Sequence, residues 1–195
     1  MALLTKLGLP TGFHSQAVHT LMQTNASHAG LERALKTHTS AIDSATRVIC
    51  PGTGERKLIE IFKSPEFSEN KWIDRWAAAS NVVEVIVPVR QAGQAARSRA
   101  MQVTKGFTQL GGFTHGSKNA SQQQAHDDAM LLNLIYRLAA SGKRATLLAY
   151  PQHVRDANYS MAAMSSLLAR YSVSESAFLH LHAELYKAPY VHSFE

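Results

Sequence analysis

Three short segments of the chain are apolar at nearly every position. They lie at residues 47–50, 82–89 and 145–150. The middle segment reads VVEVIVPV, and such a run of β-branched residues is typical of a strand buried on both faces of a parallel sheet. Pro88 fits the end or the edge of this strand, because proline cannot donate to a hydrogen-bonded ladder. The pattern therefore predicts three strands.

Between these segments the apolar residues follow a helical spacing. Residues 70–80 read NKWIDRWAAAS, in which Trp72, Ile73 and Trp76 fall on one face. Asn70 in front of them is a suitable N-cap, because its side chain can accept from the first free amides of a helix. We expect a helix that begins at this asparagine.

Two longer helices are predicted further along the chain. Residues 91–110 contain good helix formers, and residues 125–140 carry a broad apolar face. Ser121 and Gln124 match a capping box in front of the second of these helices, and Gly142 follows its end. Toward the C-terminus the segment SESAFLHLHAELYK also has a helical pattern, with Ser172 and Glu175 as its capping box.

The alternation of strands and helices favours an α/β fold. We expect a three-layer, Rossmann-like domain with a mostly parallel sheet over residues 46–195, preceded by an N-terminal helical extension over residues 1–45. The alternative is an α+β protein, mainly helical, in which residues 47–62 form a β-hairpin. The two interpretations differ in the element after the first strand, which is a helix in the first interpretation and a second strand in the other.

A glycine turn comes directly after the first predicted strand. Gly52, Thr53 and Gly54 stand between that strand and the charged segment ERK. Without side chains at the two glycines, backbone amides can approach a ligand closely, and the start of a helix adds a favourable dipole. The turn is thus the leading candidate for a site that binds a nucleotide-like small molecule.

Residues 46–151 resemble the class I S-adenosylmethionine-dependent methyltransferases. RVICPGTGE is similar to the family's first strand and glycine loop, VVEVIVPVRQAGQAARSRA to its second strand and the next helix, and HDDAMLLNLIYRLAASGKRATLLAYP to its fourth strand, helix and fifth strand. The resemblance implies a Rossmann-like fold, S-adenosylmethionine as the cofactor and methyl transfer as the reaction. It further implies that Gly52 and Gly54 line the cofactor, with Asp127 or Asp128 near its adenine. Glu84 is the acid nearest to the expected ribose position, and it would reach the ribose only if the register of the second strand shifts.

The chain departs from the pattern of this family at two places. Cys50 and Pro51 stand where the family usually has an acidic residue before the glycine loop. Val87 and Pro88 stand at the end of the second strand, where the family places the acid that binds the ribose hydroxyls. Whether the protein is an enzyme therefore stays open.

The charge balance supports a second hypothesis. Lysine and arginine number 20 against 14 acids, a formal charge of +6, and hydrophobic residues make up 45% of the 195 positions. A basic globular protein attracts phosphates and other anions. The densest basic group consists of Arg90, Arg97, Arg99 and Lys105. The alternative function is thus a non-catalytic protein that binds nucleic acid or assembles with other subunits, as in a virus or mobile element.

A third hypothesis starts from His126, Asp127 and Asp128. Imidazole and carboxylate groups are the usual ligands of hydrolytic metals, so this triplet suggests a metal-dependent hydrolase. Acids near the start of a helix have a simpler explanation, because they complement the helix dipole. The three residues alone predict no metal site.

The remaining features bear on the compartment. The N-terminus has no signal-peptide pattern, and no segment reaches the ~18 apolar residues of a membrane-spanning helix. Cys50 is the single cysteine, which excludes an intrachain disulfide and is typical of a reducing compartment. We expect a cytoplasmic protein without a membrane partner.

Overall fold

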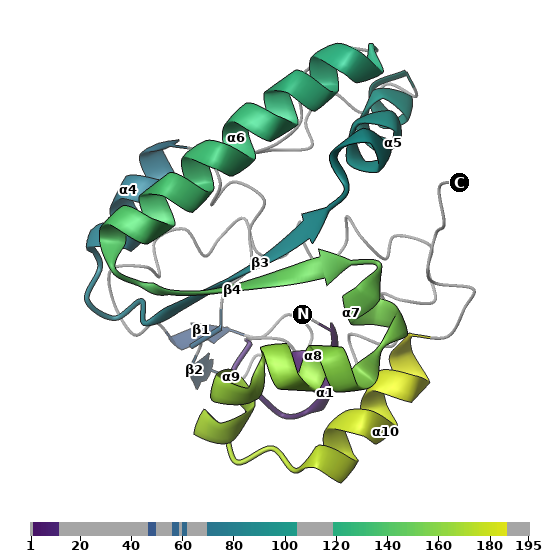
Figure 1. Cartoon of the computed structure of the whole chain (residues 1–195). Coiled ribbons are helices and arrows are strands. Elements are labelled where there is room, and N and C mark those ends of the chain that lie inside the picture. Colours follow the sequence, from purple (N-terminus) through teal and green to yellow (C-terminus); the bar gives the residue numbers. More distant parts are fainter. Residues whose placement is uncertain are drawn as a thin grey trace. The chain divides into compact units, whose positions relative to one another are not determined.

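The computed structural model describes residues 2–11, 47–49, 56–58, 60–61, 70–104 and 119–186. The chain divides into two compact units. Unit 1 joins residues 1–64 with residues 154–190, and unit 2 is centred on residues 65–153. Figure 1 shows the labelled elements of both units.

Unit 2 contains the longest strands. β3 (Glu84–Arg90) and β4 (Arg144–Tyr150) pair in parallel, from Glu84 opposite Arg144 to Arg90 opposite Tyr150. The two strands confirm the positions predicted at 82–89 and 145–150. The expected burial of the first strand on both faces is wrong, since Val87 is the one buried residue of β3. Pro88 is exposed and β4 is the one described neighbour of β3, which agrees with the expected edge position.

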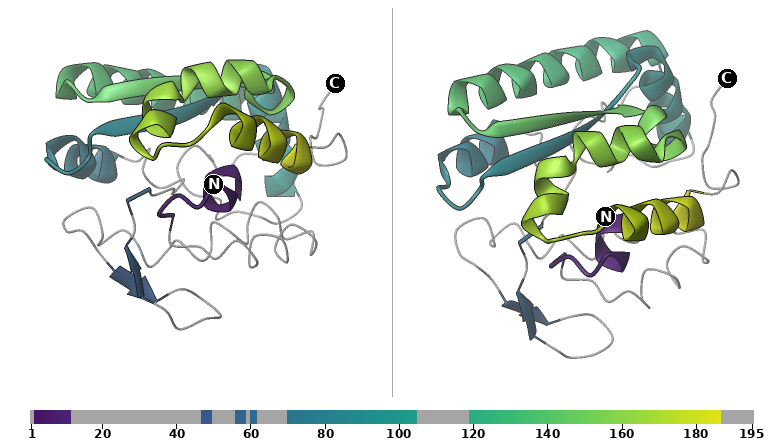
Figure 2. Two further views of the ribbon diagram at one scale, coloured as in Figure 1. Left: turned by 90° about the horizontal axis from the view of Figure 1, so that it is seen from below. Right: turned by 60° about the horizontal axis from the view of Figure 1, so that its bottom comes forward.

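The described part of unit 2 also contains three helices. They are α4 (Asn70–Ala78), α5 (Ala92–Thr104) and α6 (Ala120–Ser141). α4 and α5 both pack against α6. Figure 1 and Figure 2 show α6 on one side of the strand pair, and in Figure 1 it diverges from β4 with distance from the turn that joins them. The contact with α5 is made with small side chains, since Ala95, Ala96 and Ala100 are all buried. Ile73 and Trp76 are the buried residues of α4, as their spacing predicted.

The ends of α6 have clear causes in the sequence. The side chain of Asn119 accepts from the amides of Ser121 and Gln122, at 2.9 and 3.3 Å. The helix therefore starts before the predicted cap at Ser121, because Asn119, an N-cap residue as favourable as serine, already bonds to the first free amides. At the other end Gly142 adopts a left-handed conformation with φ of 65°, so the predicted stop is confirmed.

The predicted three-layer Rossmann-like fold is wrong, and the α+β alternative describes the chain. β1 (Arg47–Ile49) lies at the first predicted strand but pairs antiparallel with β2 (Arg56–Leu58), where the opening of a helix was expected. An apolar run predicts a strand without specifying its partner. Pairing Ile49 with Arg56 closes a short loop, which costs less entropy than a crossover to a distant strand.

A second difference concerns residues 129–139, which correspond to the fourth strand in the resemblance to methyltransferases. They belong to the continuous helix α6. The described part of the chain is mostly helical, and its longest sheet has two strands, so a layered parallel sheet is missing there. The segment has helix-favouring leucine and alanine residues between two good caps, and these outweigh its apolar character.

Unit 1 is a set of short helices around an apolar centre. They are α1 (Ala2–Lys6), α7 (Gln152–Arg155) at the point where the chain leaves unit 2, α8 (Ala157–Ala163), α9 (Ser165–Arg170) and α10 (Glu175–Leu185). α1 packs against α10, and Lys6 forms an ion pair with Glu184 at 2.7 Å. Leu3, Phe178 and Leu185 are buried in this unit.

The predicted C-terminal helix is confirmed as α10, but its cap differs. Ser174 is the N-cap and accepts from the amide of Ala177 at 3.3 Å. Ser172, the predicted cap, has a positive φ of 52° in the turn before it. The predicted boundary between an extension over 1–45 and a domain from 46 lies outside the described residues.

Candidate functional site

Arg90 and Tyr150 are the last residues of β3 and β4, and they are register partners. The guanidinium carbon of Arg90 lies 4.1 Å from the centre of the Tyr150 ring. Both side chains are half-buried. Such a contact favours the cation electrostatically and restricts the movement of the guanidinium.

His153 of α7 extends this pair. Its ring centre lies 5.7 Å from that of Tyr150, and Nδ1 lies 3.1 Å from the carbonyl oxygen of Ala149. A carbonyl oxygen only accepts, so Nδ1 donates and the proton of the neutral ring resides there. His153, three positions beyond the end of β4, is thus also oriented by that strand.

A buried ion pair lies between α5 and α6. Arg99 donates through Nη1 to Oδ2 of Asp127, and Gln123 donates through Nε2 to Oδ1 at 2.9 Å. Asp127 is 5% exposed and Gln123 is fully buried. Both oxygens of this carboxylate are therefore bonded to neighbouring side chains.

The electrostatics connect this ion pair to the strand ends. Burial lowers the pKa of Arg99, Asp127 opposes that change, and the nearby charge of Arg90 lowers the pKa further. Burial also raises the pKa of Asp127, against the opposing effects of Arg99 and Gln123. Arg90 is thus close enough to Arg99 to influence it, and Asp127 offsets the charge of Arg99, so Arg90 makes this region positive.

The start of α5 adds to this positive region. The helix begins at Ala92, two residues after the stacked Arg90, and its first amides carry the positive end of the helix dipole. Arg97 is exposed on the same helix. The stretch from residue 90 to residue 104 contains three arginines and no acid. We refer to Arg90, Tyr150, His153 and the first turn of α5 as the strand-end site.

The residues predicted from the sequence fall at different places. Gly52, Thr53 and Gly54 lie outside the described residues, between strands that pair antiparallel. Glu84 is at the opposite end of β3, where Thr146 donates to it at 3.0 Å. Asp127 is held by Arg99. The structure therefore brings Asp127, but not Glu84, near the basic residues of α5.

The sequence identified Arg90 only as one of a basic group, and it gave no reason to single out Tyr150 or His153. A signal did exist, since one strand was predicted to end at Tyr150 and the other to end at Val89, one position before Arg90. Had a parallel pairing in this register been assumed, Arg90 and Tyr150 would have been neighbours.

The metal-dependent hydrolase hypothesis gains nothing from the geometry. Within the described ranges, no three histidine, cysteine, aspartate or glutamate side chains come together as metal ligands would. Asp127 accepts from two side chains, and Asp128 is exposed on the surface of α6.

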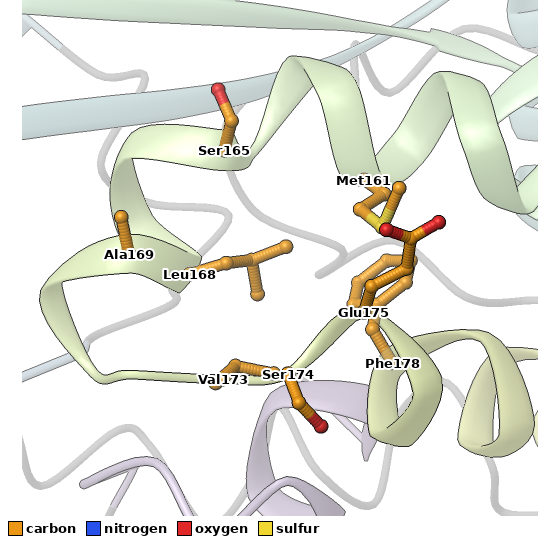
Figure 3. Close-up of a pocket in the computed structure, with 8 residues that line it drawn as sticks. All are labelled: Met161, Ser165, Leu168, Ala169, Val173, Ser174, Glu175 and Phe178. Carbon is orange, nitrogen blue, oxygen red and sulfur yellow. The ribbon is translucent and has the colours of Figure 1, made fainter.

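Unit 1 has a small pocket of about 210 Å³ beside α9 and α10 (Figure 3). Its lining residues are Met161, Ser165, Leu168, Ala169, Val173, Ser174, Glu175 and Phe178. The lining is mainly apolar, and Glu175 is the one ionisable group among the described lining residues. This hollow lacks the converging polar groups of a catalytic site.

The chain has no match among protein-family models, curated proteins or solved structures. Among the helices that the structure describes, none combines the length and the apolar character needed to cross a membrane.

Proposed function

We propose that the protein is a non-catalytic nucleic-acid-binding protein whose strand-end site contacts backbone phosphates. The observation that carries this proposal is the guanidinium of Arg90, stacked on Tyr150 at 4.1 Å beside the start of a helix. The guanidinium group is planar, and its geometry suits bidentate contacts with phosphate oxygens. Less side-chain entropy is lost on binding, because the ring already restricts the arginine.

The surrounding charge supports a polyanion as the ligand. Arg97 adds an exposed cation on α5, and the whole chain has a formal charge of +6. Release of counterions from nucleic acid favours the binding of such a surface, and it makes the affinity strongly dependent on salt. Tyr150 and His153 add aromatic groups beside the cations, a combination that suits nucleic acid better than inorganic phosphate.

The proposal is tested by fluorescence anisotropy with a labelled oligonucleotide at salt concentrations between about 50 and 200 mM. We expect Arg90→Gln to weaken binding about tenfold and to reduce the slope of log affinity against log salt by about 1, since one phosphate contact is lost. The wild-type protein should bind more tightly at the lower salt concentration.

Arg144→Gln is the matched control. Arg144 is at the opposite end of the same strand pair, its side chain is 60% exposed, and the substitution removes the same charge. If Arg144→Gln weakens binding as much as Arg90→Gln, the net charge and not the strand-end site is responsible. If the wild-type protein shows no affinity for oligonucleotides, the proposed function is wrong.

Binding of S-adenosylmethionine is the competing hypothesis, based on the resemblance to methyltransferases. The antiparallel pairing of β1 and β2 gives it less support, because the glycine turn does not lead into a helix. A ligand that binds only the folded protein raises its melting temperature. A clear rise with S-adenosylmethionine, abolished by Gly54→Val, would favour a cofactor site at residues 52–54.

A further inference from the structure

The tautomer of His153 decides where its ring gains a second proton. Nδ1 donates to the carbonyl oxygen of Ala149 at 3.1 Å, so the neutral ring carries its proton on Nδ1. The second proton must therefore bind at Nε2, which points away from this hydrogen bond. Because Nδ1 donates in both forms, the bond to Ala149 holds the ring in the same place while its charge changes.

The ring of His153 lies close enough to Arg90 for both to act on one bound anion. The guanidinium carbon of Arg90 lies 4.1 Å from the centre of the Tyr150 ring, and the centre of the His153 ring lies 5.7 Å from the same point. The two groups cannot be further apart than the sum of these distances, which is less than the Debye length of ~10 Å at 0.1 M salt. A protonated His153 would thus add a second cation to the strand-end site.

The charged groups near His153 determine when this second cation is favourable. Arg90 lies against Tyr150, whose ring is the neighbour of His153. Arg155 of α7 and Asp156 follow in the sequence, and the carboxylate of Asp156 accepts from a backbone amide as the N-cap of α8. Arginine does not lose its charge in proteins. In the free protein Arg90 therefore disfavours a further cation at His153, whereas a phosphate bound to Arg90 offsets that charge and favours it.

We propose that His153 is a second phosphate contact of the strand-end site, and that its ring takes up a proton from the solvent when nucleic acid binds. This inference rests on the proposed function of the site. The protonated ring donates through Nε2 to a phosphate oxygen beside the contact made by Arg90. By linkage, a ligand that favours the protonated ring binds more tightly as the pH falls. The affinity of the protein for nucleic acid is thus regulated by pH.

The pH range of the effect follows from the chemistry of histidine. The ordinary pKa of a histidine is about 6.5, and a contact between the ring and a phosphate raises the pKa in the complex. The additional affinity is therefore complete below the pKa of the free protein, and it is lost as the pH rises through the pKa of the complex. A rise of about one pKa unit corresponds to about tenfold in affinity. We expect about five- to tenfold tighter binding at pH 5.5 than at pH 8.

The test is fluorescence anisotropy of the full chain with a labelled oligonucleotide, at constant salt, between pH 5.5 and pH 8. His153→Asn is neutral throughout, and its amide group can still donate to a carbonyl oxygen, so this variant should lose most of the rise in affinity at pH 5.5. His153→Lys keeps its positive charge over the whole range, so it should bind at pH 8 nearly as tightly as at pH 5.5. His180→Asn is the matched control, because it removes an exposed histidine of α10 and should retain the rise of the parent.

The outcomes separate this inference from the function on which it rests. A parent that binds the oligonucleotide equally well at both pH values would overturn the role of His153 and leave the proposed function intact. A His153→Asn variant that keeps the full rise in affinity would assign the effect to other histidines and would also overturn the inference. A parent that binds at no pH would refute both proposals.

A second measurement uses the parent protein and does not depend on the folding of a variant. The carbon-bound ring protons of His153 report its protonation in nuclear magnetic resonance spectra, and His153→Asn assigns their signals. Titration with and without the oligonucleotide gives the pKa of this ring in both states. We expect the pKa to be higher in the complex by about one unit or less. A pKa that does not change on binding would contradict the proposal.

Discussion

At the scale of single residues, Tyr171 contributes to the stability of the folded protein, and its contribution depends on pH. Its hydroxyl group donates to Oε2 of Glu60 at 2.6 Å, which connects the part of unit 1 before unit 2 with the part after it. Burial raises the pKa of Tyr171, and the bond to Glu60 and its negative charge raise it further. The folded protein thus keeps this proton at pH values where the unfolded chain has lost it.

We expect Tyr171→Phe to lower the free energy of unfolding by about 0.5 to 1 kcal/mol at neutral pH, the usual contribution of one exposed hydrogen bond. Because the folded pKa is raised, the contribution is complete below pH ~10 and is lost as the pH rises through the folded pKa. Urea denaturation at pH 7, 10 and 11 measures both effects. The variant should lose less stability than the parent above pH 10, and an equal loss would contradict this reasoning.

At the scale of single elements, we expect alanine substitutions of two glycines to change the stability in opposite directions. Gly93 is the second residue of α5, and a Cβ there would lie 3.8 Å from the side chain of Gln124, an ordinary van der Waals contact. Gly142 ends α6 with φ of 65°, a conformation that costs an alanine about 1 kcal/mol. Gly93→Ala should stabilise the protein by about 0.5 to 1 kcal/mol, and Gly142→Ala should destabilise it by about 1 kcal/mol. Thermal unfolding of both variants checks the signs, and the same sign for both would refute the argument.

The elements also show how far the sequence could predict the structure. The strands at 82–89 and 145–150 and the helix α6 were found because periodicity and caps are local properties. The leading interpretation of residues 47–58 was wrong, and the alternative with a β-hairpin was right, because the partner of a strand is chosen by loop entropy and by the rest of the sheet. The strand-end site was missed for a related reason, since the stack of Arg90 on Tyr150 exists only in the parallel register of β3 and β4.

At the scale of the whole molecule, the division into two units leads to a prediction about fragments. The described elements from α4 to β4 contact one another within unit 2, whereas unit 1 needs both of its segments. Residues 65–153 expressed alone should show helical circular dichroism, unfold cooperatively and bind oligonucleotide with an affinity comparable to that of the full chain. Residues 1–64 alone should show no cooperative transition. An unfolded 65–153 fragment would contradict this picture.

The discontinuity of unit 1 also has a consequence for biosynthesis. A ribosome that works from the N-terminus releases residues 65–153 before residues 154–190, which complete unit 1. At about 5 to 20 residues per second, the early segment waits for several seconds with its apolar side chains, including Leu3 and Leu4, still without their final neighbours. During that interval we expect chaperones to bind the exposed apolar side chains of the nascent chain. Residues 65–153 are already synthesised when the last helices of unit 1 leave the ribosome.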